Sequence, residues 1–199
     1  MLDILSEVEF YVRFSTVTLL ATLYDSVGDS LHEGILTSPL GVSRLIDLLD
    51  DKREIIRNEG LLLLIKLTSV NAEIQKIVAF ENAFERLFSI IFEEGSIDGG
   101  IIVQDCLQLM QNLLRYNASN QNLFRETSCI KQIPKLLYSK KLSPRGDYID
   151  IPLSDSSAQW SDQKETNTVF VLNLIRILVE GNNQNTTINQ VSSYLLLTL

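Results

Sequence analysis

Apolar residues recur along this chain at the spacing of an α-helix. Leu45, Leu48 and Leu49 stand at i, i+3 and i+4, and the same spacing returns in segments 87–91 and 133–137. This spacing places the apolar side chains on one stripe of a helix, whereas a half-buried strand would alternate. The pattern therefore predicts helices with one buried face.

The pattern also repeats as a whole, which predicts an array of similar units. When the sequence is shifted by 46 residues, seven identical pairs align without a gap and with the helical phase preserved. Weaker copies align upstream at shifts of 44 and 42 residues, and downstream at a shift of 65 residues. The seven pairs are Ile56/Ile102, Leu61/Leu107, Leu63/Leu109, Leu67/Leu113, Asn71/Asn117, Ala72/Ala118 and Gln75/Gln121.

Each unit is predicted to hold a long, a short and a medium helix, which in the second unit cover 55–69, 72–80 and 83–92. A three-helix unit of this length is the period of armadillo and HEAT repeats. Such helices bury their apolar faces against neighbouring units, which gives an α-solenoid. We therefore predict an all-α, armadillo-type solenoid, a right-handed superhelix of three-helix repeats and helices only. The residues expected between units are Leu63, Leu67, Leu87, Leu109, Leu113 and Ile133.

The predicted repeats cover approximately 8–50, 52–94, 98–138 and 162–199 of one partial array over 1–199. Segment 139–161, rich in serine, aspartate and proline, is predicted to be an inserted surface loop that is mobile near 145–157 and ends at Trp160. The uncharged end 194–199 lacks a polar cap, so we expect it to associate with another copy or to fold back.

Local breaks in the helical pattern can also be read from the sequence. The slip between the first two units falls at Gly28, where we expect a loop, and Gly95 is expected to stop the third helix of the second unit. Pro39 follows Ser38, which is typical of an N-cap and a first-turn proline.

Composition narrows the classes of function. Hydrophobic residues make up 45% of the chain, which excludes global disorder, and the net charge of −8 argues against nucleic acid as a partner. The longest apolar run, 61–65, is too short to span a membrane, and the first residues do not resemble a signal peptide. Two cysteines and one histidine cannot build a zinc site or a disulfide framework. We expect a soluble protein of a reducing compartment.

No motif for phosphate, dinucleotide, zinc or nucleophilic chemistry occurs in the sequence, so we predict neither an enzyme nor a cofactor. His32 is interpreted as a surface histidine. Cys106 falls on the position of Gly60 in the preceding unit and is interpreted as a packing residue. The carboxylate pairs 50–51 and 93–94 are interpreted as solvated charges at helix ends.

One alternative stays open inside the solenoid class, a receptor for a basic peptide of importin or catenin type. Importins line their concave face with tryptophan and asparagine one turn apart on each long helix. Only Asn112 fits that ladder here, although the acidic charge would suit a basic cargo. The equivalent positions are Thr18/Thr22, Leu62/Lys66, Gln108/Asn112 and Asn173/Ile177.

Several segments resemble the globular head of the general vesicular transport factors, the Golgi vesicle-tethering proteins. The match runs through "GVSRLIDLLDDKREIIRNEGLLLLIKLT" (41–68), "QKIVAFENAFERLFSII" (75–91) and, within 98–126, "VQDCLQLMQNLL" and "SNQNLFRE". It resumes in "WSDQKETN" (160–167), and its most specific part is "VAFENAFERL". The resemblance departs from the family in the insertion and after Glu180.

The resemblance implies a non-catalytic scaffold for vesicle tethering in ER-to-Golgi and intra-Golgi traffic. It implies Rab-type GTPases, SNAREs and golgins as partners, and homodimerisation of the full-length protein. It also implies a cytoplasmic protein, peripheral on Golgi and vesicle membranes, with only indirect membrane contact.

Within "VAFENAFERL", a stripe of Phe80, Phe84, Leu87 and Phe88 is predicted to be core, with the polar residues pointing away from it. These polar residues, together with polar positions of the long helices, are the candidate partner-binding residues. They are Lys66, Glu81, Asn82, Glu85, Arg86, Gln108 and Asn112.

Overall fold

The computed structural model describes residues 2–142, 148–152 and 160–180. The chain divides into two compact units, one up to Arg86 and one from Leu87 onward, and each is taken by itself below. The segments predicted to be mobile (145–157) and self-associating (194–199) lie mostly or wholly outside the described residues.

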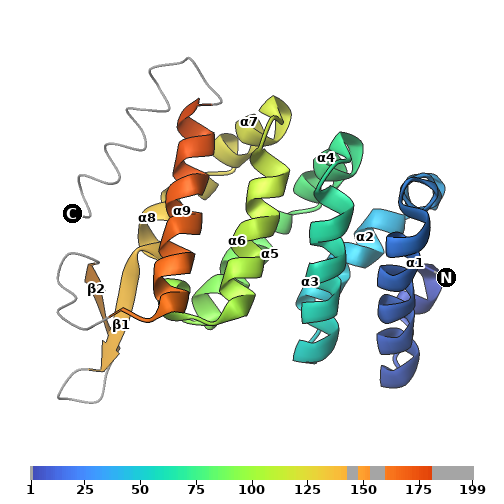
Figure 1. Ribbon diagram of the computed structural model, residues 1–199, viewed down its shortest axis with the longest axis horizontal. Coiled ribbons are helices and arrows are strands. Elements are labelled where there is room, and N and C mark those ends of the chain that lie inside the picture. The colour runs from blue at the N-terminus through green and yellow to red at the C-terminus, as the bar shows by residue number, and fades with distance from the viewer. Residues whose placement is uncertain (1, 143–147, 153–159, 181–199) are drawn as a thin grey trace. The chain divides into compact units, whose positions relative to one another are not determined.

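The first unit is helical, and its two long helices α1 and α3 pack side by side (Figure 1). The predicted helix over 55–69 is found one residue earlier, and the predicted helix over 72–80 is found with those limits. The elements are η1 (Leu2–Ser6), α1 (Phe10–Thr37), α2 (Gly41–Ile46), η2 (Asp47–Asp50), α3 (Glu54–Thr68), α4 (Ala72–Phe80) and the beginning of α5 (Ala83–Glu93).

Helix α1 is sharply kinked at Gly28, whose backbone angles are φ 15° and ψ −85°. The predicted loop is therefore a single-residue break between two helical segments. His32, one turn beyond the kink, is 5% exposed, and its ring meets the ring of Tyr24 edge-on at 5.4 Å between centroids. The surface interpretation of His32 is wrong, because the kink turns this side chain inward onto the preceding segment.

The predicted helix start at Ser38 and Pro39 is also wrong. Ser38 is instead the residue that ends α1, and it accepts a hydrogen bond from the backbone N–H of Gly41 at 3.0 Å. Helix α2 begins at Gly41, after Leu40 in a left-handed conformation with φ 58°. Gly41 is needed there, because a Cβ atom would lie 2.5 Å from the carbonyl oxygen of Ile35.

An asparagine and a glutamine fasten the turn between α3 and α4. The side chain of Asn71 accepts hydrogen bonds from the backbone N–H groups of Glu73 and Ile74, which caps α4. Gln75 donates from Nε2 to the carbonyl oxygen of Thr68 at 2.8 Å, which satisfies a buried group at the end of α3. We call this arrangement the amide corner.

The second unit has an amide corner at the matching place, between α6 and α7. Asn117 accepts from the backbone N–H of Asn120, and Gln121 donates from Nε2 to the carbonyl oxygen of Leu114 at 2.9 Å. The residue pairs 71/117, 75/121 and 68/114 are each 46 positions apart, so the repeat in the sequence is a repeat of this hydrogen-bonded turn.

In the second unit, α6 and α9 pack side by side (Figure 1). Asn167 of α9 fixes the loop before α6, because its side-chain amide donates to the carbonyl oxygens of Ile97 and Gly99 at 3.2 and 2.9 Å. The elements are the rest of α5, η3 (Ser96–Asp98), α6 (Ile101–Leu114), α7 (Ala118–Glu126), η4 (Cys129–Gln132), α8 (Ile133–Leu136), β1 (Tyr138–Leu142), β2 (Tyr148–Pro152) and α9 (Asp162–Glu180).

Strands β1 and β2 pair antiparallel, with Tyr138 opposite Pro152 and Leu142 opposite Tyr148. The expectation of helices only is therefore wrong within the insertion, although the all-α solenoid class holds for the rest of the described chain. Tyrosine and isoleucine favour strands, and their presence in 148–151 counts for more than the serine and proline content of the whole insertion. After the insertion, the ammonium group of Lys164 lies 5.3 Å from the ring centroid of Trp160, at the start of α9.

The predicted core is mostly confirmed. Of the stripe in "VAFENAFERL", Phe84, Leu87 and Phe88 are buried, but Phe80 is 61% exposed and its assignment to the core is wrong. Phe80 is the last residue of α4, so it does not continue the stripe of α5. All six residues expected between the predicted repeats are buried, namely Leu63, Leu67, Leu87, Leu109, Leu113 and Ile133.

A buried carboxylate joins α1 to the beginning of α3. The side chain of Asp51 is 3% exposed, and it pairs with Arg13 at 2.6 Å and with Arg53 at 3.0 Å. Burial alone would raise the pKa of Asp51, but hydrogen bonds from Arg53 and the charges of Arg13 and Arg53 hold that pKa below its ordinary value. Asp51 is therefore not the solvated charge expected, whereas Asp50 is exposed.

We predict that Asp51→Asn lowers the free energy of unfolding at pH 7 by about 1–3 kcal/mol, since it removes a charged acceptor from two arginines. A carboxyl group whose folded-state pKa is depressed stabilises the fold above its unfolded-state pKa of about 3.9. The difference between wild type and variant should therefore shrink as the pH falls below about 4. Urea unfolding across this range measures it, and Asp50→Asn is the matched control, because the pair that Asp50 forms with Arg86 is partly exposed and is worth little. An equal effect of the two variants would contradict the assignment.

Helix α3 approaches η2 closely at Gly60. A Cβ atom on Gly60 would lie 2.6 Å from Cβ of Leu48, which the backbone of η2 holds in place. The matching position of α6 is Cys106, which is fully buried, so its interpretation as a packing residue is confirmed.

We predict that Gly60→Ala destabilises the protein by about 1–3 kcal/mol through overpacking, despite the better helix propensity of alanine. Gly34→Ala, also inside a helix but with open space around the added Cβ, should stabilise it by about 0.5–1 kcal/mol. If the close approach is real, thermal or urea unfolding gives changes in stability of opposite sign for the two variants. A gain in stability for both variants would refute it.

Candidate interaction surfaces

Two of the four polar candidates in "VAFENAFERL" are held by contacts within the first unit. Glu81 accepts a hydrogen bond from the hydroxyl of Ser43 at 2.9 Å, which links the end of α4 to α2. Arg86 pairs with Asp50 at 2.6 Å and donates to the carbonyl oxygen of Ile46 at 3.2 Å. The first role of both side chains is therefore to hold helices of the first unit in place.

The other two candidates face solvent beside an exposed aromatic ring. Asn82 and Glu85 are exposed, and within the described residues no hydrogen bond or ion pair engages their side chains. Asn82 has φ 60°, a left-handed conformation that asparagine tolerates, and it turns the chain from α4 into α5. Phe80, the last residue of α4, is exposed at the same turn, and we call these three exposed residues the corner surface (Phe80, Asn82, Glu85).

Lys66 lies on α3 and is tied to α1. Its ammonium group binds both carboxylate oxygens of Asp25, at 2.7 and 2.9 Å. Both side chains are partly exposed, so the pair is worth little in stability. It leaves Lys66 at the surface but neutralised.

Gln108 and Asn112 both lie on α6 and bond to each other, while a separate set of amides links α6 to α9. Gln108 donates to the side-chain oxygen of Asn112 at 3.1 Å. Gln163 of α9 donates to the side-chain oxygens of Gln104 and Asn167, at 3.0 and 3.1 Å. The bond from Gln163 to Gln104 joins the two helices, whereas the bond between Gln108 and Asn112 lies within α6 and engages both candidate side chains.

Asp105 follows Gln104 on α6, and its carboxyl group has a shifted pKa. It is partly buried, and burial raises the pKa of its carboxyl group. No hydrogen bond or ion pair of the described residues offsets that cost.

Among the described residues, no three histidine, cysteine, aspartate or glutamate side chains gather to hold a metal ion, and no helix is long and apolar enough to cross a membrane.

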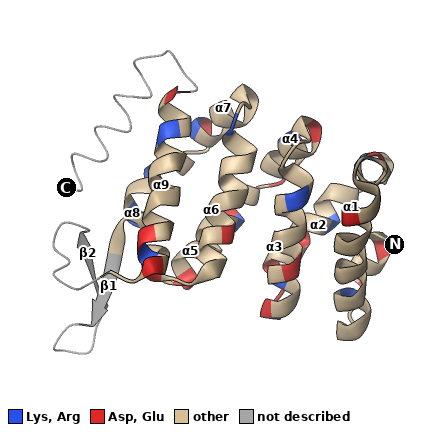
Figure 2. Ribbon diagram, viewed as in Figure 1, with Lys and Arg blue, Asp and Glu red and all other residues tan. Residues whose placement is uncertain are grey.

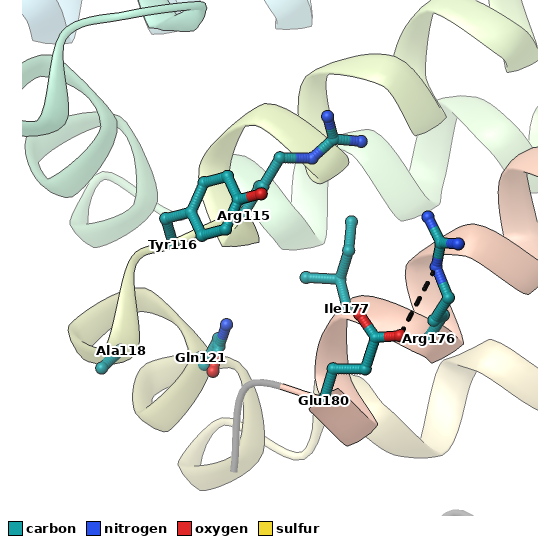
Figure 3. A pocket seen from close by; sticks show the side chains of 7 residues that line it. All are labelled: Arg115, Tyr116, Ala118, Gln121, Arg176, Ile177 and Glu180. Atoms are coloured by element: carbon teal, nitrogen blue, oxygen red, sulfur yellow. Dashed lines mark ion pairs between the residues drawn. The ribbon is translucent and has the colours of Figure 1, made fainter.

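The sequence analysis missed a pocket of about 440 Å³ in the second unit. Figure 3 shows Arg115 and Tyr116 on one side of it and Arg176, Ile177 and Glu180 on the other, with Ala118 and Gln121 of α7 below. The alignment at a shift of 46 residues contains a signal for this pocket, because Arg115 and Tyr116 align with a serine and a valine of the preceding repeat.

No family model matches the chain. General vesicular transport factor p115 of Homo sapiens is 50% identical over 183 residues, which cover 92% of this chain and 18% of p115. Intracellular protein transport protein USO1 of Saccharomyces cerevisiae is 38% identical over 182 residues, 91% of this chain and 10% of that protein. The chain belongs to the general vesicular transport factor family. It spans less than a fifth of the length of these family members.

Solved structures agree with this membership. The crystal structure of Uso1-1 superimposes with a TM-score of 0.84 at 34% identity, over 99% of this chain and 29% of that one. The armadillo repeats only protein of Plasmodium falciparum superimposes with a TM-score of 0.61 at 16% identity, over 90% of this chain and 67% of that one, which shows the fold alone. The predicted family and the armadillo-type all-α class are confirmed.

Family membership gives a coarse functional statement. The relatives are named for vesicular and intracellular protein transport, and they include p115 proteins of several mammals as well as the yeast protein. These names describe the relatives, and the identity to them runs along nearly the whole of this chain rather than through a local motif.

Proposed function

We propose that this chain is a non-catalytic, protein-binding scaffold within a vesicle-tethering factor of ER-to-Golgi and intra-Golgi traffic. The observation that carries the proposal is the 50% identity to p115 over 92% of the chain. The absence of a metal-binding group among the described residues is compatible with it but does not carry it.

The proposal extends to partners and place of action. Rab-type GTPases, SNAREs and golgins are the proposed partners, the full-length protein is proposed to be a homodimer, and it would act in the cytoplasm on Golgi and vesicle membranes without inserting into them. We keep the repeat limits 8–50, 52–94, 98–138 and 162–199 as part of the same proposal.

Within the first unit, the corner surface is the proposed contact for a protein partner. Phe80 is 61% exposed at the end of a helix whose turn is fixed by the contacts of Glu81 and Arg86. An exposed aromatic ring on a rigid turn can become a binding anchor at low entropic cost. Asn82 and Glu85 would supply the polar rim. Lys66, Gln108 and Asn112 are proposed as secondary contacts.

Binding of the chain to a panel of Rab-type GTPases, each loaded with GTP or GDP, tests the proposal. We predict nucleotide-dependent binding to at least one of them, weakened about tenfold or more by Phe80→Ser, because truncating an aromatic anchor typically costs more than 1 kcal/mol. Val70→Ser is the matched control, since Val70 is a comparably exposed apolar residue, 75% exposed, outside the corner surface.

Two results would contradict the proposal. Equal binding by the wild type and Phe80→Ser would remove the corner surface from the interface. Binding of a basic nuclear-signal peptide in place of every GTPase would favour the importin-type alternative.

A further inference from the structure

The pocket between the α6–α7 turn and the end of α9 combines charge, an aromatic ring and an apolar wall. Arg115 and Arg176 supply two guanidinium groups, Tyr116 the ring, and Ile177 with Ala118 the wall. All these residues belong to the second unit. The pocket shares no residue with the corner surface, and its argument does not depend on a role in traffic.

The arginines of this pocket are available for a new partner. Within the described residues, Arg115 forms no ion pair. Among the residues that the structure describes, Arg176 pairs only with Glu180, at 3.9 Å, and both side chains are more than 60% exposed (Figure 3). In Figure 2 both signs of charge meet at this end of α9. Because an exposed pair of this length is worth little, a carboxylate arriving from outside can displace Glu180. A guanidinium group holds a carboxylate through two parallel hydrogen bonds.

The backbone of Tyr116 adopts the left-handed conformation, which bulky residues rarely adopt. It has φ 58° and is 98% exposed, so neither burial nor a special backbone preference explains an aromatic residue here. The matching residue of the first unit is Val70, which does not have a positive φ. The strained turn projects the ring beside Arg115, and a tyrosine in this position is typical of a recognition site.

The floor of the pocket favours negative charge as well. Ala118 is the first residue of α7, so the N-terminal end of that helix faces the pocket, and the helix dipole attracts anions there. This contribution supports the two arginines and would not make a site alone.

From these observations we propose that the pocket binds an acidic peptide segment of a partner protein. One carboxylate of the segment lies between Arg115 and Arg176, and a neighbouring apolar side chain packs on Tyr116 and Ile177. A peptide fits better than a phosphorylated lipid surface for two reasons. Glu180 at the rim repels a doubly charged phosphate group more strongly than a single carboxylate. The apolar wall would also stay empty beside a bare phosphate.

Fluorescence anisotropy with a labelled peptide of about ten residues tests the proposal, the peptide being glutamates interrupted by one phenylalanine and one leucine. We expect saturable binding to the chain that Arg115→Ala, Arg176→Ala and Tyr116→Ala each weaken about tenfold. Glu180→Gln should strengthen binding about threefold, because it removes the competing carboxylate. A merely structural role would not produce this gain.

Lys131→Ala is the matched control, an exposed cation of the same unit that does not line the pocket, and it should leave binding unchanged. Phe80→Ser should also leave it unchanged, which separates this site from the proposed GTPase contact. Circular dichroism of each variant checks that the helices are intact.

Three outcomes would overturn the proposal. The first is no saturable binding of the acidic peptide by the wild type. The second is binding that the arginine variants and Lys131→Ala weaken equally, which would show a diffuse charge effect. The third is tighter binding of inositol phosphates or of phosphatidylserine vesicles, lost in the same arginine variants, which would make the site a phosphate site.

Discussion

The amide corner is the interaction on which the rest of each unit depends. A long helix ends with unsatisfied carbonyl groups, and a short helix begins with unsatisfied N–H groups, so a tight turn between them is costly when buried. Gln75 and Gln121 satisfy a carbonyl of the long helix, while Asn71 and Asn117 cap the short one. With these backbone groups satisfied, the apolar stripes can pack around the turn without leaving the same backbone groups unpaired.

Because the amide corner fixes the turn, the residues beside it can differ between the two units and can contribute to function. The asparagine and the glutamine whose side chains form the corner are identical between the two copies, whereas the two positions just before the capping asparagine change from serine and valine to Arg115 and Tyr116. A fixed turn thus presents variable side chains in a set place, as loops on rigid scaffolds commonly do. The corner surface at Phe80 follows the same logic, because Glu81 and Arg86 hold the turn and leave its neighbours exposed.

The sequence predicted helices, their order and most of the core, because apolar periodicity and the repeat reflect local chemistry. It failed where a kink, a helix end or a distant segment decides whether a residue is buried. His32 is buried by a kink, and Asp51 is buried because Arg13, far away in sequence, reaches it. Phe80 is exposed because α4 ends at that residue. The pocket joins residues about 60 positions apart, Arg115 and Arg176, and no local pattern could bring them together.

Urea unfolding of Gln75→Leu and Gln121→Leu, each compared with wild type, tests the role of the amide corner most directly. Leucine keeps the approximate volume of the side chain but removes the hydrogen bond that Gln75 donates to Thr68, or the one that Gln121 donates to Leu114. The account predicts that each variant loses about 0.5–1.5 kcal/mol of unfolding free energy, the net contribution of one hydrogen bond. Stability within about 0.5 kcal/mol of wild type for both variants would contradict it, and the repeat would then be held by apolar packing alone.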